Sequence, residues 1–210
     1  FTVVGRAADY MPYFIYAFSR MGEMGVGRKR ARYSLERIVA RNPFSGECEE
    51  VFDGEVARNR RLPVTWEDAA REAERLEGER VRVEFLTPTQ VRFRGEVAAG
   101  APPFAALAQA LLIRIPMLSA VHCGRLWRED FRARVERARA VRTVRDEAAW
   151  VSFRRYSSFR KRQEPLEGVV GGAEYAGPLQ EFLPLLCMGQ LTHAGRHAVF
   201  GLGRYRVLAA

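Results

Sequence analysis

The residues best suited to chemistry lie near the end of the chain, in the segment HAGRHAVFGLGRYRV at 193–207. This segment holds His193 and His197, with Arg196 and Arg204 nearby. Histidine exchanges protons near neutral pH, and metal-free RNA cleavage needs a general base for the 2′-hydroxyl and a general acid for the leaving 5′-oxygen. We therefore take His193 and His197 as candidate catalytic residues, with a packing role as the alternative for each.

Glycines shape the same segment, which contains Gly195, Gly201 and Gly203. No Gly-Lys-Ser/Thr sequence follows, as a Walker loop requires, and we expect a strand next, whereas a dinucleotide fingerprint opens a helix. Glycine permits unusual φ angles and a close approach of backbones. The pattern therefore suits either packing of a helix against a strand or close passage of an RNA backbone.

A second basic feature is the segment RRYSSFRKRQ at 154–163, where cationic and aromatic residues interleave. Phosphate contacts next to aromatic stacking are how open sheets and loops hold single-stranded RNA. A solvated basic loop is the alternative. The residues that we expect to contact RNA are Arg154, Arg155, Tyr156, Arg160, Lys161 and Arg162 with Phe159 among them, and Arg196, Arg204, Gly195, Gly201 and Gly203 in the glycine-rich segment.

Composition favours an anionic partner. The formal net charge is +9, and a basic domain most often binds nucleic acid. A basic amphipathic membrane helix and the arginine usage of a GC-rich genome are competing explanations. Hydrophobic residues make up 48% of the chain, enough for a sizeable core, so intrinsic disorder is not expected.

Several functional classes are not expected. No apolar run approaches the roughly 20 residues needed to span a bilayer, and the first residues lack the basic start of a signal peptide. The cysteines are Cys48, Cys123 and Cys187, which are far apart, odd in number and without metal-ligand spacing to the histidines. We therefore predict reduced thiols, no metal site, no cofactor and a cytoplasmic location.

Hydrophobic periodicity and turn signals predict an α+β fold. From residue 80 the expected order is βαββαβ with one extra helix, the order of a ferredoxin-like or RRM-like domain, in which helices cover one face of an antiparallel sheet. Helices are expected at 11–22, 65–78, 104–121, 126–141 and 179–191, and strands at 1–5, 25–40, 48–56 (as a hairpin), 80–97 (as a bent strand or a hairpin, broken at Thr87-Pro88), 150–158, 167–177 and 199–208.

An internal similarity suggests that this domain occurs twice. Residues 11–35 and 182–208 both run from an apolar helix through a Gly-hydrophobic-Gly-Arg turn to a strand, and chance similarity is the alternative. We therefore predict the rear part of a first ferredoxin-like domain with a linker helix at 1–79, and a C-terminal ferredoxin-like domain at 80–210. The first residue is Phe rather than Met, which suggests that the natural chain begins upstream.

Three segments together resemble the CRISPR-associated Cas6 family, whose C-terminal domain carries a Phe-Leu-Thr-Pro strand, an Arg-x-Ser-x-Arg-Gln-like strand end and a closing Phe-Gly-Leu-Gly turn. The segments are FLTPTQVRFRG at 85–95, WVSFRRYSSFRKRQEPLEGVVGGAEYAG at 150–177 and FLPLLCMGQLTHAGRHAVFGLGRYRV at 182–207. PYFIYAF and GVGRKRARY, within residues 1–40, resemble the rear of the family's first domain. YSSFRKRQ departs from the family pattern by an extra spacing.

The resemblance implies an endoribonuclease of antiviral defence that processes CRISPR repeat transcripts without a metal. The 2′-hydroxyl would attack the adjacent phosphate and leave a 2′,3′-cyclic phosphate and a 5′-hydroxyl. The implied partners are CRISPR repeat RNA, other CRISPR-associated proteins and, in a homodimer, a second copy of the chain. The family's general-base histidine usually belongs to the front half of the first domain, which this chain does not show, so the resemblance assigns no catalytic residue here.

Two alternatives remain open. One is an inactive RNA-binding subunit of a CRISPR effector complex, and the other is a ferredoxin-like assembly or small-molecule-binding domain with no role in RNA metabolism. A cleavage assay separates the first from the enzyme, and the salt dependence of RNA binding separates the second.

Overall fold

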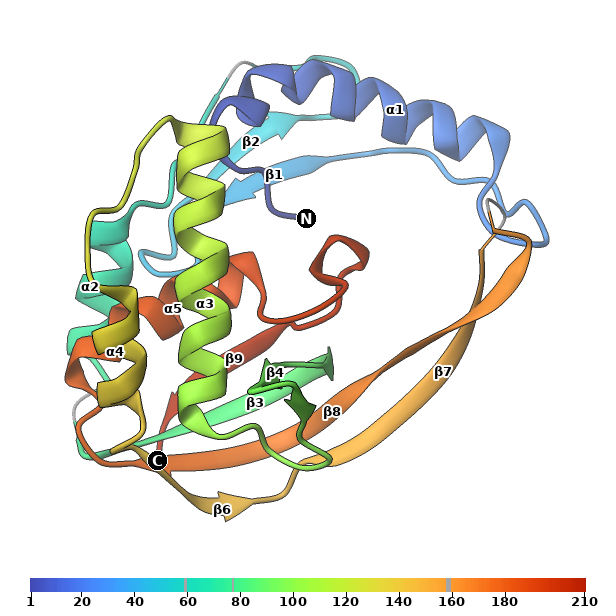
Figure 1. Ribbon diagram of the computed structural model, residues 1–210. Helices are drawn as coiled ribbons and strands as arrows, with labels where there is room; N and C mark the ends of the chain where they lie inside the picture. The colour runs from blue at the N-terminus through green and yellow to red at the C-terminus, as the bar shows by residue number, and fades with distance from the viewer. Residues whose placement is uncertain (59, 77, 158–159) are drawn as a thin grey trace. The chain divides into compact units, whose positions relative to one another are not determined.

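The computed structural model describes residues 1–58, 60–76, 78–157 and 160–210 (Figure 1). Phe159, which we expected among the RNA-contacting residues, lies outside these ranges. The chain divides into two compact units, Val3–Asp68 and Ala69–Ala210.

The second unit is built on one antiparallel sheet with the order β6-β8-β3-β9, and β7 also pairs with β8. β6 and β7 pair with successive stretches of β8, so together they fill one position at the edge. The sheet therefore has the four strand positions of a ferredoxin-like domain, with β3 and β8 in the centre, and the predicted α+β class is confirmed. The strands are β3 (Arg80–Thr89), β6 (Arg142–Asp146), β7 (Ala149–Ser157), β8 (Arg162–Ala176) and β9 (Tyr205–Ala209).

Helices cover one face of this sheet (Figure 1). Alternation places Val81, Val83 and Phe85 of β3 in the core, where each is almost completely buried. The ring of Phe104 packs edge-on against Tyr175, with ring centroids 5.4 Å apart. The helices are α3 (Phe104–Leu118), α4 (Phe131–Ala138) and α5 (Leu183–Thr192), and the π-helical turn Ser119–Cys123 and the 3-10 turns Gln180–Phe182 and Ala198–Phe200 flank them.

Helix α3 corrects the expectation that no apolar run approaches the length needed to span a bilayer. With its π-helical extension it forms a helix of 20 residues, Phe104–Cys123, which contains an 18-residue stretch with a mean hydropathy of 1.8, so by length and composition alone it could cross a membrane. Core helices of soluble proteins have the same properties. Here Leu107 and Leu111 are fully buried within the second unit.

Three predicted boundaries in this unit are also wrong. The expected strand at 80–97 ends at Thr89 and is followed by a separate small hairpin, β4 (Arg92–Phe93) and β5 (Glu96–Val97). Of the helix expected at 126–141, only the part that forms α4 (Phe131–Ala138) is helical. The last strand begins at Tyr205 rather than at residue 199, because residues 198–200 form a 3-10 turn and residues 201 and 203 have positive φ angles of 83° and 72°, outside the β region.

The first unit has a small core of its own. Ile15, Val51 and Phe52 are buried together, with Met11 packed against them. No strand forms at 1–5, and between 25 and 40 the predicted strand is present only from Ile38. The elements are the 3-10 turn Gly5–Tyr10, α1 (Met11–Met24), β1 (Ile38–Arg41) and β2 (Cys48–Phe52), which pairs with β1.

The helix predicted at 65–78 is present as the shorter α2 (Trp66–Glu74). Its start is held by a reciprocal cap: the Thr65 N–H donates to Asp68 Oδ2 at 2.8 Å, and the Asp68 N–H donates to Thr65 Oγ1 at 3.3 Å. Such a cap satisfies backbone donors that the first turn of a helix leaves free.

The internal similarity has a counterpart in contacts within each unit. In α1 the Tyr33 carbonyl approaches Gly22 so closely that a Cβ there would meet it at 2.2 Å, and in α5 a Cβ on Gly189 would meet the Tyr205 hydroxyl at 2.0 Å. Each tyrosine hydroxyl also donates to a carbonyl in the helix it approaches, Tyr33 to Phe18 at 2.7 Å and Tyr205 to Leu186 at 2.8 Å. A glycine and a tyrosine thus make corresponding contacts in both units.

Candidate nucleic-acid interface

The glycine-rich loop, residues 193–204, is fastened to the end of β3. Thr87 makes the connection: its hydroxyl donates to the Gly201 carbonyl at 3.0 Å and accepts from the Arg204 N–H at 2.9 Å. The Leu86 N–H donates to the Arg204 carbonyl at 2.8 Å. This pairing explains why a Leu-Thr-Pro-Thr segment and a Gly-Leu-Gly-Arg segment belong to one structural unit although over 100 residues separate them.

Two glycines let the loop approach its neighbours. A Cβ on Gly203 would lie 1.9 Å from the Ala194 carbonyl oxygen, and a Cβ on Gly195 would lie 2.3 Å from the Gln90 carbonyl oxygen. Real Cβ atoms do not come so close. Gly201 differs, because a Cβ there would meet nothing within 4 Å. Gly195 therefore packs the loop against the segment after β3, and Gly203 packs within the loop. The role of all three glycines towards RNA stays a prediction.

His193 lies half-buried at the base of the loop. Its Nδ1 is 2.9 Å from the Leu202 carbonyl oxygen, and because a carbonyl only accepts, Nδ1 carries the proton and Nε2 the lone pair. Burial lowers the pKa of His193 below its ordinary value, and the charges of Arg114 and Arg204 lower it further. His193 is therefore neutral at pH 7.

His197 occupies the outer part of the loop. Its ring stacks on Phe200, with centroids 5.8 Å apart and planes 17° from parallel. The Arg155 guanidinium lies 4.4 Å from the centroid of the same Phe200 ring. Phe200, half-exposed, thus connects the loop to β7. Within the described residues no hydrogen bond joins the two imidazoles, so they are not a pre-formed acid–base pair.

The β7–β8 hairpin carries the other residues predicted to bind RNA. They differ in the strand face that they occupy and in whether a carboxylate pairs with them. Strand alternation puts Arg155 on the face that meets the loop, whereas Arg154 and Tyr156 lie on the other face. Arg160 and Arg162 both pair with Glu164, at 2.8 and 3.5 Å. Sequence reasoning did not anticipate that one carboxylate offsets part of the charge that we had assigned to RNA binding.

Arg196 and Arg204 have no carboxylate partner among the described residues. The Arg196 side chain donates to Gln90 Oε1 at 3.4 Å, and its backbone N–H donates to the Gln90 carbonyl at 3.0 Å. Both side chains are exposed. These two guanidinium groups are therefore available to an anionic ligand.

The open face of the sheet is different, because Arg82 and Arg206 on this face are paired with carboxylates. Arg82 contacts three carboxylates, with distances of 3.5 Å to Glu84, 2.6 Å to Glu147 and 3.5 Å to Glu174. Arg206 pairs with Glu84 at 2.6 Å, and these contacts lower the pKa of the Glu84 carboxyl. The ion pairs hold the face in a charge-balanced state.

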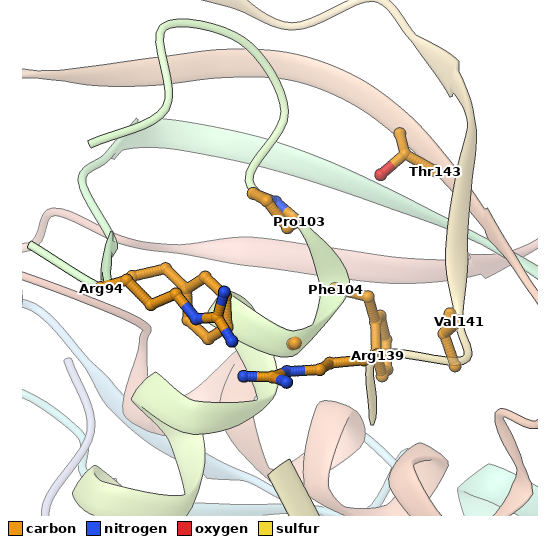
Figure 2. A pocket seen from close by; sticks show the side chains of 8 residues that line it. Arg94, Pro103, Phe104, Arg139, Val141 and Thr143 are labelled. Atoms are coloured by element: carbon orange, nitrogen blue, oxygen red, sulfur yellow. The ribbon is translucent and has the colours of Figure 1, made fainter. Parts of the chain in front are cut away.

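A cavity of about 270 Å³ lies at the start of α3. Figure 2 shows Arg94 and Arg139 pointing toward one another across it. Arg139 pairs with Glu136 at 2.7 Å, and the Arg94 guanidinium lies 5.6 Å from the ring centroid of Phe93. None of the residues predicted to bind RNA lines this cavity.

Three residues of the interface escaped sequence reasoning. Thr87 and Gln90 lie at the end of β3 and just after it, in a segment noted only for its break at Thr87-Pro88 and its resemblance to the family pattern, and Phe200 was taken as strand. An exposed aromatic residue directly before a glycine in a basic segment was the signal available for Phe200. Nothing local indicated that Thr87 would hold the loop, because that contact depends on the fold.

Three solved structures of similar proteins carry Cas6 in their descriptions. A Thermus thermophilus Cas6 is 17% identical, with a TM-score of 0.49, covering 69% of this chain and 58% of its own. A Cas6 product complex is 15% identical, with a TM-score of 0.49, covering 70% and 56%. A partial Cas6-RT-Cas1–Cas2 complex is 12% identical, with a TM-score of 0.52, covering 78% and 30%, and shows a shared fold.

The chain therefore spans between half and two thirds of the length of the first two structures. No curated protein matches it. A family described as an N-terminal domain matches residues 1–64. The family described as CRISPR-associated endoribonuclease Cas6 matches residues 83–205, which include most of β3, the β7–β8 hairpin and the glycine-rich loop. The chain belongs to the CRISPR-associated Cas6 family.

Proposed function

We propose that this chain is a cytoplasmic, metal-independent endoribonuclease that binds and cleaves CRISPR repeat RNA. The observation that carries the proposal is the glycine-rich loop in a Cas6 family member. It places two histidines beside two arginines that have no carboxylate partner among the described residues, and Phe200 links it to Arg155 of the basic hairpin.

The loop's cations and the hairpin would bind the RNA backbone. Arg196 and Arg204 can each take a phosphate in bidentate fashion. On the hairpin, Arg154 and Tyr156 share one exposed face, which suits a phosphate contact next to a stacked base. Lys161, Arg160 and Arg162 add positive charge at the end of the hairpin, reduced by Glu164.

The chemistry would use the loop's imidazoles. Attack of the 2′-oxygen on the adjacent phosphorus breaks the bond to the 5′-oxygen and leaves a 2′,3′-cyclic phosphate and a 5′-hydroxyl. Neutral His193, with its proton fixed on Nδ1, can accept the 2′-hydroxyl proton on Nε2. His197, on the same loop, would supply a proton to the leaving oxygen.

The test is cleavage of a transcript of the CRISPR repeat from the same genome, in excess EDTA. We expect a single cut in each repeat, with a cyclic phosphate on one product and a 5′-hydroxyl on the other. His193→Ala should lower the rate at least about 100-fold, the usual contribution of a general base, while RNA binding is retained. His122→Ala, which removes a histidine outside the loop, is the matched control.

The other outcomes identify the alternatives. Tight binding without cleavage in the unsubstituted chain would indicate an inactive RNA-binding subunit. Lack of binding at moderate salt would indicate an assembly or small-molecule-binding domain. Full activity of both His193→Ala and His197→Ala would place the base outside the loop. Because one similar structure is a Cas6-RT-Cas1–Cas2 complex, we include CRISPR-associated proteins, and a second copy of this chain, among the proposed partners.

A further inference from the structure

A second cavity lies beside the glycine-rich loop, in the second unit, and of the residues predicted to bind RNA only Gly195 and Arg196 line it. Its volume is about 300 Å³, and it is bounded by α3, the segment after β3 and the loop residues Gly195 and Arg196. That volume is at the lower end of those of small-ligand sites. The cavity thus adjoins the proposed RNA path and has room for one small ligand.

The charge lining this cavity is entirely positive. Arg92, Arg114 and Arg196 line it, and no aspartate or glutamate does. Within the described ranges none of the three forms an ion pair with a carboxylate: Arg114 Nε donates to the Thr192 carbonyl, and Arg196 donates to Gln90. Burial lowers the pKa of Arg114, so its charge is poorly compensated where it lies. An anion entering the cavity would supply that compensation.

The cavity also has an apolar wall that no other element of the second unit covers. Ile113 and Met117, one turn apart on α3, are 56% and 61% exposed although both are large and apolar. The amide groups of Gln90 and Gln109 lie at the same cavity and offer both donors and acceptors. Guanidinium groups, an apolar wall and amides are together what a phosphate, a base face and a base edge require.

We propose that this cavity binds one unstacked nucleotide of a single-stranded RNA. The base lies against Ile113 and Met117, and Arg92, Arg114 and Arg196 hold its phosphate. This deepens the proposed function, because it adds to the backbone contacts of the loop a site that holds a single base. Arg196 belongs to the glycine-rich loop and also lines the cavity, so the same RNA strand can contact both.

The first experiment detects the nucleotide at the cavity itself. The chain has five methionines, and the methyl NMR signal of Met117 can be assigned as the one that disappears in Met117→Leu. Adenosine, guanosine, cytidine and uridine 5′-monophosphates serve as probes, with inorganic phosphate and the unphosphorylated nucleosides as separate arms. We expect a saturable upfield shift of the Met117 signal with at least one monophosphate, because a base ring stacked over a methyl group shields it.

The outcomes of this titration are decisive. A smaller response to the nucleoside and to phosphate alone supports a site that uses both parts of the ligand. An equal response to inorganic phosphate would reduce the cavity to an anion site and overturn the proposal. So would the lack of any shift of Met117 up to millimolar concentrations.

The second experiment uses a matched pair on one helical segment. Ile113→Glu puts a carboxylate into the cavity, whereas Val121→Glu makes the same change at a residue that is 70% exposed and outside it. We expect Ile113→Glu to abolish the Met117 response and to weaken single-stranded RNA binding about tenfold, with Val121→Glu unchanged in both. Thermal unfolding of both variants checks that each is folded.

The two proposals fail differently. If monophosphates shift Met117 but the chain cleaves no repeat RNA, the cavity stands and the endoribonuclease proposal fails. If Ile113→Glu binds and cleaves RNA like the unsubstituted chain, the nucleotide cavity is wrong and the endoribonuclease proposal stands.

Discussion

The open face of the sheet and the edge formed by the glycine-rich loop carry the same residue type in opposite electrostatic states. On the open face Arg82 contacts three carboxylates, and Arg206 pairs with Glu84. At the loop edge Arg196 and Arg204 have no carboxylate partner among the residues described, and Arg92 and Arg114 line a cavity without an acid. A guanidinium that must first leave a carboxylate gains less from a phosphate than a free one does.

This difference indicates which part of the surface makes the net charge of +9 available to an anionic ligand. RRM-like domains commonly bind RNA on the open sheet face through aromatic side chains that stack on bases. Here the outward residues of the central strand β3 include Arg82 and Glu84, which are tied to each other and to neighbouring strands. We infer that this domain contacts RNA with its loop edge and the β7–β8 hairpin rather than with the outward face of the central strand β3.

The strongest test of this difference between the loop edge and the open sheet face is a variant that displaces the loop without removing a charge. Gly203→Ala would place a Cβ 1.9 Å from the Ala194 carbonyl, at a φ of 72°. We expect the loop to leave β3, at a cost of about 3 kcal/mol of unfolding free energy from overpacking and left-handed strain. RNA binding should fall below detection in a filter or gel assay.

Gly201→Ala is the matched control for this effect. Its φ of 83° imposes similar strain, but a Cβ there would meet nothing within 4 Å. We expect a decrease of about 1–2 kcal/mol in the free energy of unfolding, measured by chemical denaturation, with RNA binding largely kept. Equal weakening of binding in both variants would show that the close packing of Gly203 against Ala194 is not what holds the interface.

A smaller effect should come from the arginines themselves. The double variant Arg196→Ala/Arg204→Ala removes two free guanidinium groups, and we expect roughly tenfold weaker binding of single-stranded RNA at moderate salt. The slope of log affinity against log salt should fall by about 1.4, which is about 0.7 for each phosphate that the variant no longer neutralises.

The matching double variant on the open face is Arg145→Ala/Arg206→Ala. It removes the same charge, but both arginines are paired with glutamates. We expect the affinity to fall less than at the loop edge and the salt slope to stay nearly unchanged. If the two double variants weakened binding equally, the net charge alone would control RNA binding. The distinction between unpaired arginines at the loop edge and paired arginines on the open face would then be wrong.

The order of the elements was predictable because it depends on local signals. The alternation of Val81, Val83 and Phe85 predicted a half-buried strand, and α3 was evident from its apolar stripe. β6 was not predicted, since all five of its residues are exposed and show no alternation to detect. It forms a strand because the edge of β8 offers it backbone partners.

The electrostatic state of each arginine was not predictable. Arg206 and its partner Glu84 are 122 positions apart, so only the pairing of β3 with β9 brings them together. Arg114 did leave a signal, as a single charge within the apolar sequence LLIRIP. Such an isolated charge in a core helix indicates a buried contact or a ligand site, and sequence reasoning passed over it.

The smallest predicted effect concerns the pH dependence of the loop edge. Burial and neighbouring arginines lower the pKa of His193 below its ordinary value of 6.5, so the unfolded chain binds a proton there more readily than the folded protein does. Stability from this residue is therefore full above pH 6.5, falls as the pH drops below that value, and levels off below the lowered pKa of the folded state.

Thermal unfolding between about pH 7.5 and about pH 5.5, above the range where most carboxylates titrate, measures this dependence. We expect the unfolding temperature of the unsubstituted chain to fall by a few degrees, and that of His193→Gln to fall less. His122→Gln, which removes a histidine from the turn after α3, should follow the unsubstituted chain. If His193→Gln kept the full decline, His193 would be protonated as readily in the loop as in the unfolded chain. It would then not be held in the neutral form that the proposed proton transfer needs.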